Sequence, residues 1–157
     1  MVITYKKAGV DISQIKKSQK VIGQLIASTH KLQKQVKMKH GFGHYAGIVE
    51  IPGGKLLATH TDGVGTKVII ATMMKKFDTI GIDCVAMNVN DIICIGATPI
   101  SFVDYIAANT NDQRIFKQIV SGLVKGAKKS SVPIVGGETA IMPDLISGKG
   151  FGFDLVG

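Results

Sequence analysis

The chain has 157 residues, of which 45% are hydrophobic, a length ample for one packed domain and somewhat short for two. No apolar run approaches the ~20 residues that a membrane helix needs, and the first residues lack the order of a signal peptide, so a globular cytoplasmic protein is expected. Cys84 and Cys94 match no metal-binding spacing and are predicted to be buried free thiols.

The net charge of +8 is concentrated in one segment. Between Asp11 and Glu50 there is no acidic residue, and the lysines there are Lys16, Lys17, Lys20, Lys31, Lys34, Lys37 and Lys39. Such a segment can attract nucleic acid, an anionic lipid surface or a phosphorylated small molecule. The stretch from Lys16 to Lys39 contains no aromatic residue, which argues against nucleic acid, and a solvated helix face is the simpler interpretation.

The first predicted element is a helix from about Ile15 to Lys34, capped by Asp11 or Ser13, with an apolar side and a lysine-rich remainder. Gly41-Phe42-Gly43-His44 then indicates a flexible or tightly turned loop. His44, like His40 just before the loop, can transfer protons or contact a phosphate, although most loop histidines do neither.

A hairpin and a glycine-containing turn follow. Ala46–Ile51 and Lys55–His60 are predicted strands around the turn Pro52-Gly53-Gly54. The second strand leads into Thr61-Asp62-Gly63-Val64-Gly65-Thr66-Lys67, and a helix is predicted from Val68 to Lys76.

The turn between that strand and that helix has residue types that bind phosphate. Gly63 and Gly65 allow successive backbone N–H groups to approach an anion, and Lys67 can meet a phosphate oxygen. Asp62 is poorly placed among such groups unless a cation lies between, and Mg²⁺ is the usual bridge between carboxylates and nucleotide phosphates. For this stretch taken alone, an ordinary Asp-Gly turn is the favoured interpretation, and neither standard nucleotide-binding motif fits it.

The segment Thr79–Ala97 contains no Lys, Arg or Glu and is predicted to be a helix, apolar nearly all round, in the middle of the molecule. Asn88 and Asp91 stand three residues apart and share one face of it. Because a buried carboxylate is costly unless it is paired or bound to a cation, this face indicates a hydrogen-bond network or a metal or ligand site.

The last third of the chain predicts a strand over Pro99–Ala107 and a helix from Asn111 or Asp112 to about Ser130. The inward side of that helix is assigned to Ile115, Ile119, Val120, Leu123 and Val124.

A short strand, Pro133–Val135, is predicted to stop at Gly136-Gly137-Glu138-Thr139, where glycines and a carboxylate can approach a phosphate and its metal together, although most Gly-Gly turns are only turns. The chain ends in what is predicted to be a strand just beginning, so a fragment of a longer protein is expected. The order of elements predicts an α+β or α/β layer with helices over one sheet.

Five blocks of the sequence occur in the order found in one enzyme family. The chain resembles the phosphoribosylformylglycinamidine cyclo-ligase (aminoimidazole ribonucleotide synthetase) family over that family's N-terminal domain. The blocks are Tyr5 to Asp11, Thr61 to Lys67, Gly81 to Asp91, Asp104-Tyr105 and Gly136 to Ala140.

The resemblance implies that residues 1–157 form an ATP-binding and dimerisation domain, with residues 1–45 as a basic segment and glycine-rich loop, and that the family's C-terminal domain is absent from this chain. It implies an α+β fold of the ferredoxin-like type, with helices on one face of a mixed or antiparallel sheet. That sheet would be completed as a barrel across a homodimer.

The resemblance also implies an activity: the ATP-dependent ring closure of formylglycinamidine ribonucleotide to aminoimidazole ribonucleotide, ADP and phosphate in purine biosynthesis, with ATP and Mg²⁺ as cofactors. Asp62, Asp91 and Glu138 would form the metal set. Lys67 would act on the transferring phosphoryl group, with His44 or His60 handling a proton. The remaining phosphate-binding residues would be Gly41, Gly43, Gly63, Gly65, Thr66, Gly136, Gly137 and Thr139, together with Lys67.

The chain departs from the family pattern at His40, Ile141 and Asp144, which puts the nucleotide loop and the substrate contacts in question. Three alternatives stay open at this point: a related ATP-dependent enzyme of the same architecture, a dimerising nucleotide-binding domain without turnover, and a basic nucleic-acid-binding module. The isolated fragment is expected to be inactive.

Overall fold

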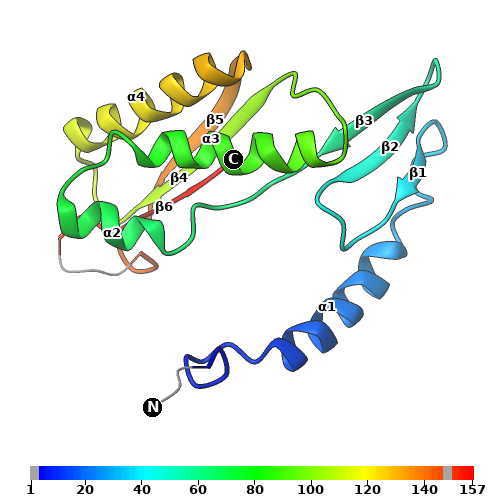
Figure 1. Cartoon of the computed structure of the whole chain (residues 1–157), viewed down its shortest axis with the longest axis horizontal. Helices are drawn as coiled ribbons and strands as arrows, with labels where there is room; N and C mark the ends of the chain where they lie inside the picture. The colour runs from blue at the N-terminus through cyan, green and yellow to red at the C-terminus, as the bar shows by residue number, and fades with distance from the viewer. Residues whose placement is uncertain (1–3, 147–149) are drawn as a thin grey trace. The chain divides into compact units, whose positions relative to one another are not determined.

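The computed structural model describes residues 4–146 and 150–157, and the chain divides into two compact units, Met1–Thr59 and His60–Gly157. Figure 1 shows the elements of each unit along the chain. Among the described residues, no helix is both long enough and apolar enough to cross a membrane.

The first unit contains helix α1 (Ile12–Ala27) and the strands β1 (Lys37–His40), β2 (Gly47–Ile51) and β3 (Lys55–Thr59). The strands form an antiparallel sheet in the order β1-β2-β3, which confirms the predicted hairpin. Its turn uses left-handed backbone at Gly53 (φ 90°) and Gly54 (φ 73°), a conformation that glycine adopts without steric cost.

The predicted Asp11 cap of helix α1 is confirmed, because the Asp11 side chain accepts hydrogen bonds from the backbone N–H groups of Ser13 and Gln14. The helix begins at Ile12, earlier than the predicted start at about Ile15. The prediction that it continues to Lys34 is wrong. The helix ends at Ala27, since the Ser28 and Thr29 hydroxyls donate to backbone carbonyls three residues earlier and compete with the helical pattern. Strand β1, which follows, was not predicted.

Few apolar side chains of the first unit are covered by its own residues. Ala46, at 4% exposed, is the one buried hydrophobic residue in its described part, residues 4–59. Helix α1 has no buried residue and leaves an aliphatic stripe in solvent: Ile12, Ile15, Val21, Ile22, Leu25 and Ile26.

The second unit contains α2 (Lys67–Met74), α3 (Ile80–Cys94), β4 (Phe102–Ala108), α4 (Gln113–Ser130), β5 (Ile134–Ile141) and β6 (Phe153–Val156). Its sheet has the order β5-β4-β6, with β4 parallel to β5 and antiparallel to β6. The prediction of an α+β fold with a mixed sheet is confirmed. The prediction of one sheet is wrong, because the hairpin strands belong to a separate sheet and local patterns do not encode strand partners.

The core of the second unit lies between its sheet and its helices, which Figure 1 shows on one side of the strands. Alternate residues of β4, Phe102 and Ile106, point into this core, whereas Val103 is 55% exposed on the opposite face. The helices α3 and α4 contribute Cys84, Val85, Ile119 and Leu123 to the core. In α4 the predicted inward positions Val120 and Val124 are wrong, since both are exposed at the margin of the apolar side.

The two cysteines of α3 differ. Cys84 is fully buried, and burial, with smaller contributions from the charges of Asp104, Asp62 and Asp154, raises the pKa of its thiol to about 12. Cys94 is exposed, so its predicted burial is wrong. It is the last residue of the helix, and its neighbour Ile93 is also 55% exposed, so α3 is covered on one side rather than all round.

The predicted turn at Gly136-Gly137 is also wrong. Strand β5 runs through both glycines, which pair in parallel with Val103 and Asp104 of β4. A Cβ at Gly137 would lie 2.7 Å from the backbone oxygen of Asp104, so glycine is required here for close strand approach.

Candidate metal and phosphate site

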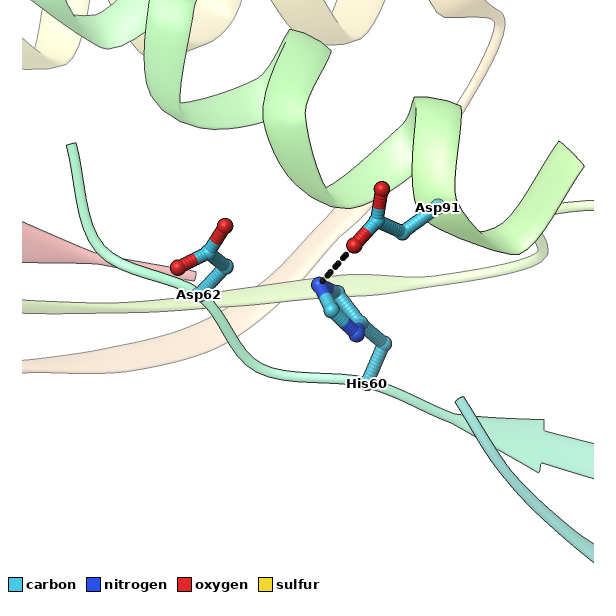
Figure 2. A group of neighbouring side chains, drawn as sticks. All are labelled: His60, Asp62 and Asp91. Atoms are coloured by element: carbon cyan, nitrogen blue, oxygen red, sulfur yellow. Dashed lines mark ion pairs between the residues drawn. The ribbon is translucent and has the colours of Figure 1, made fainter. Parts of the chain in front are cut away.

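Three side chains of the second unit converge at one point: His60, Asp62 and Asp91 (Figure 2). Their potential ligand atoms all lie within 4.8 Å of one another. His60 comes directly after β3, Asp62 follows two residues later, and Asp91 projects from the last turn of α3. An imidazole and two carboxylates at this separation form a donor set that can hold a cation.

Backbone and side-chain hydrogen bonds fix Asp62 from two directions. Its backbone exchanges both hydrogen bonds with Gly157, which places it beside the end of β6. The amide side chain of Asn88 accepts from the Asp62 N–H at 3.0 Å and donates to the Asp62 carbonyl at 3.2 Å. One Asp62 carboxylate oxygen accepts from the Gly63 N–H at 2.8 Å. The acid is therefore held in place before any ligand binds.

His60 is the most enclosed member of the group, with its side chain 12% exposed. Its Nε2 atom lies 3.3 Å from a carboxylate oxygen of Asp91. This is an ion-pair distance, but within the described residues the buried Nε2 has no partner of acceptable hydrogen-bond geometry. The contact is therefore a close approach of a ring nitrogen and a carboxylate oxygen rather than a formed hydrogen bond.

Asp104 is a further acid, and it lies on the helix-facing side of the sheet. It alternates along β4 with the core residues Phe102 and Ile106, and burial raises the pKa of its carboxyl group. Its register partner in β5 is Gly137, the residue without a side chain, so the carboxylate has room there.

The predicted phosphate-binding turn lies immediately after the cluster. Gly63 forms a bridge to Val156, Gly65 has left-handed backbone (φ 59°), and Thr66 precedes the first residue of α2, Lys67. The Lys67 ammonium lies 3.1 Å from Asp83, and both side chains are nearly half exposed. Such a surface pair contributes ~0 to 1 kcal/mol, so the lysine can exchange Asp83 for a phosphate oxygen.

Glu138 is not part of the cluster. It lies in β5 opposite Tyr105, so strand alternation places it on the face of the sheet away from Asp104 and α3. Gly136, Gly137 and Thr139 are in the same strand. The structure therefore brings two of the predicted metal-binding acids together, adds His60 to them, and leaves Glu138 elsewhere.

The glycine-rich loop belongs to the first unit and connects β1 to β2. Gly43 has φ 105°, Gly41 follows the last residue of β1, and the rings of His40 and His44 stack with centroids 5.4 Å apart. His40 is therefore an aromatic neighbour of the loop. The other two residues that differ from the family pattern are exposed. Ile141 is the last residue of β5, and Asp144 lies just beyond that strand.

The family resemblance implied a proton-transfer role for His60 and did not group it with the metal-binding acids. A signal for the grouping was present, because residues two apart in an extended segment point to the same side, as His60 and Asp62 do. The hydrogen bonds between the buried Asn88 side chain and the Asp62 backbone were predicted only in general terms, as a hydrogen-bond network or a ligand-binding face of the helix.

The sequence matches the model of one protein family over most of its length. Residues 43–153 match the model of the AIR synthase related protein, N-terminal domain. The chain belongs to this family.

The curated relatives are more specific. The chain is 48% identical over 151 residues to the phosphoribosylformylglycinamidine cyclo-ligase of Saccharolobus solfataricus, covering 96% of this chain and 44% of the relative. It is 51% identical over 146 residues to the cyclo-ligase of Methanocaldococcus jannaschii, covering 93% of this chain and 41% of the relative. The chain thus spans less than half the length of these relatives. The crystal structure of tt0281 from Thermus thermophilus has a similar fold, with a TM-score of 0.54 and 18% identity over 84% of this chain and 41% of that one.

Proposed function

We propose that this chain is the N-terminal part of a phosphoribosylformylglycinamidine cyclo-ligase, which closes the imidazole ring of aminoimidazole ribonucleotide at the expense of ATP. The observation that carries the proposal is the 48% identity over 96% of the chain to a relative of that name. A non-catalytic domain and a nucleic-acid-binding module have no comparable support. The pathway is soluble, and on that ground a cytoplasmic location is part of the proposal.

The proposed cofactors are ATP and Mg²⁺, with Asp62 and Asp91 as the acids nearest to the metal. Their position agrees with this, since Asp62 directly precedes Gly63 of the glycine turn and Asp91 has a carboxylate oxygen within 4.8 Å of the Asp62 carboxylate. Mg²⁺ bound there would neutralise phosphate charge. Glu138, in β5, is kept as the third proposed metal-binding acid. The remaining phosphate contacts are proposed to come from Thr66, Gly136, Gly137, Thr139, Gly41 and Gly43.

The chemistry needs positioning and charge neutralisation more than covalent help from the protein. An amide oxygen is a poor leaving group, so it is first phosphorylated by ATP, and a nearby nitrogen then displaces phosphate as the ring closes. Lys67 is proposed to meet the transferring phosphoryl group after leaving Asp83, from which it is 3.1 Å away. His44 or His60 is proposed to take the proton of the attacking nitrogen, although the surroundings of His60 favour a different role.

Calorimetric titration with a non-hydrolysable ATP analogue tests this site. Binding is expected to require Mg²⁺, and Asp62→Asn is expected to weaken it by at least about tenfold, because the substitution removes a charged metal ligand. The matched control is Asp78→Asn, which removes an acid of the same unit that pairs only with Lys76 and Lys125 among the described residues. Analogue binding that is indifferent to both Mg²⁺ and the Asp62 substitution would contradict the assignment.

A homodimer is the proposed assembly, formed through the sheet face that the helices leave open. That face carries Val103 (55% exposed) and Val135 (63% exposed), apolar side chains that a second copy would bury. Val103→Glu is expected to convert a dimer into a monomer, because a charge buried without a partner opposes association. Sedimentation velocity measures the change, with Leu145→Glu as a control at another exposed apolar position. A wild-type chain that is monomeric at every concentration would rule out this assembly.

A further inference from the structure

The donor atoms of the three-residue cluster do not suit Mg²⁺ equally well. Asp62 and Asp91 offer carboxylate oxygens, the ligands that Mg²⁺ prefers. His60 offers an imidazole nitrogen, a common ligand of Fe²⁺, Ni²⁺, Cu²⁺ and Zn²⁺. Mn²⁺, the first member of the transition-metal affinity series for nitrogen and oxygen sites, accepts such a mixed donor set, whereas Mg²⁺ is bound through oxygen ligands. The composition of the cluster therefore indicates a softer divalent ion.

The state of the His60 nitrogen supports a ligand role. Nε2 is buried and has no hydrogen-bond partner in residues 4–146 and 150–157. A buried polar atom without a partner costs free energy, so such atoms are rare in folded proteins. A cation between Nε2 and the Asp91 carboxylate, now 3.3 Å apart, would give both groups a partner.

The three residues are also held where a common ligand can reach them. Asn88 and Gly157 fix the backbone of Asp62, and His60 is two residues earlier in the same segment. Asp91 is three residues after Asn88 on α3, so the same helix that clamps Asp62 supplies the third ligand. Figure 2 shows the imidazole and both carboxylates as neighbours, with the Asp91 carboxylate facing the His60 ring.

We propose that His60 Nε2 and the carboxylates of Asp62 and Asp91 form a mixed nitrogen and oxygen site that selects a divalent transition-metal ion, represented by Mn²⁺, over Mg²⁺. The inference deepens the proposed function, on which it rests for the role of the two acids. It gives His60 the role of a metal ligand instead of a proton-transfer group. The binding requires no nucleotide, so the metal alone is the probe.

Titration of the chain with Mn²⁺ tests the site, and the loss of the electron paramagnetic resonance signal of free Mn²⁺ measures binding. Competition of Mg²⁺ with bound Mn²⁺ then gives the affinity for Mg²⁺. Mn²⁺ is expected to bind more tightly than Mg²⁺. His60→Ala is expected to weaken Mn²⁺ by at least about tenfold and Mg²⁺ by less than about twofold, since removing the nitrogen affects chiefly the metal that uses it. His60→Asn, which keeps a polar side chain, is expected to behave in the same way, and circular dichroism establishes that both variants are folded.

His30→Ala is the matched control, because it removes a histidine of the first unit and leaves the cluster intact. Equal affinity of the wild type for both metals, or an equal loss of both in folded His60 variants, would overturn the proposal. Failure of the proposed function would look different. In that case the affinity for the ATP analogue would change neither with Mg²⁺ nor in Asp62→Asn, whatever the effect of His60→Ala on the Mn²⁺ affinity.

Discussion

Gly81→Ala is expected to destabilise the second unit severely. A Cβ added at Gly81 would lie 2.2 Å from the backbone nitrogen of Leu123 and 2.5 Å from the carbonyl oxygen of Ile119, both in α4. These are backbone atoms, so α3 and α4 would have to move apart and open the core between them. Gly122 has the reciprocal position, since its own Cβ would lie 3.1 Å from the Cα of Gly81.

The expected loss in the free energy of unfolding is about 3 kcal/mol or more, at the upper end of the range for overpacked cores. It outweighs the gain of about 1 kcal/mol that alanine brings over glycine inside a helix. Urea unfolding followed by circular dichroism measures it. The control is Gly136→Ala, whose Cβ would have its nearest neighbour at 3.8 Å, an ordinary contact with Val103. A Gly81→Ala chain as stable as this control would show that the two helices have room to separate.

The elements predicted well are those with strong local signals. Helix α4 begins at its Asp112 cap and ends at Ser130, as expected, because the cap and the apolar spacing are both encoded within the helix. The hairpin of β2 and β3 follows for the same reason, since its turn needs glycines. The limits of α1 were misjudged because the Ser28 and Thr29 hydroxyls end it without any proline or glycine.

The elements predicted poorly depend on partners far away in the chain. Gly136 and Gly137 have the local composition of a turn, yet parallel pairing with β4 extends them into a strand. The same pairing explains why Glu138 lies apart from Asp62 and Asp91. Because Glu138 is in a strand, the alternation of side chains places it on the face of the sheet away from α3. Asp62 and Asp91 could be proposed from their residue types, but their convergence with His60 depends on how α3 packs.

Asn88→Ala is expected to affect both stability and the metal site. Asn88 is 5% exposed and makes three hydrogen bonds, at 3.0 Å with the Asp62 N–H, 3.2 Å with the Asp62 carbonyl and 2.9 Å with the Cys84 carbonyl. Removing the amide takes one hydrogen-bond partner from each of these backbone groups, while the Asp62 N–H and carbonyl keep their bonds to Gly157. The expected loss in the free energy of unfolding is about 1 to 3 kcal/mol, the net contribution of three hydrogen bonds in a buried position.

Asn90→Ala is the control for helix effects, because Asn90 is an exposed position of the same helix. A purely structural role of Asn88 would lower stability and leave the metal affinity of the folded protein unchanged. A positioning role predicts a second effect: because two of its three bonds hold the Asp62 backbone, the Mn²⁺ affinity of the still-folded variant should also fall. Metal titration at a temperature well below unfolding separates the two. Unchanged metal affinity would mean that Gly157 alone orients Asp62, since the backbone of Gly157 provides its other pair of hydrogen bonds.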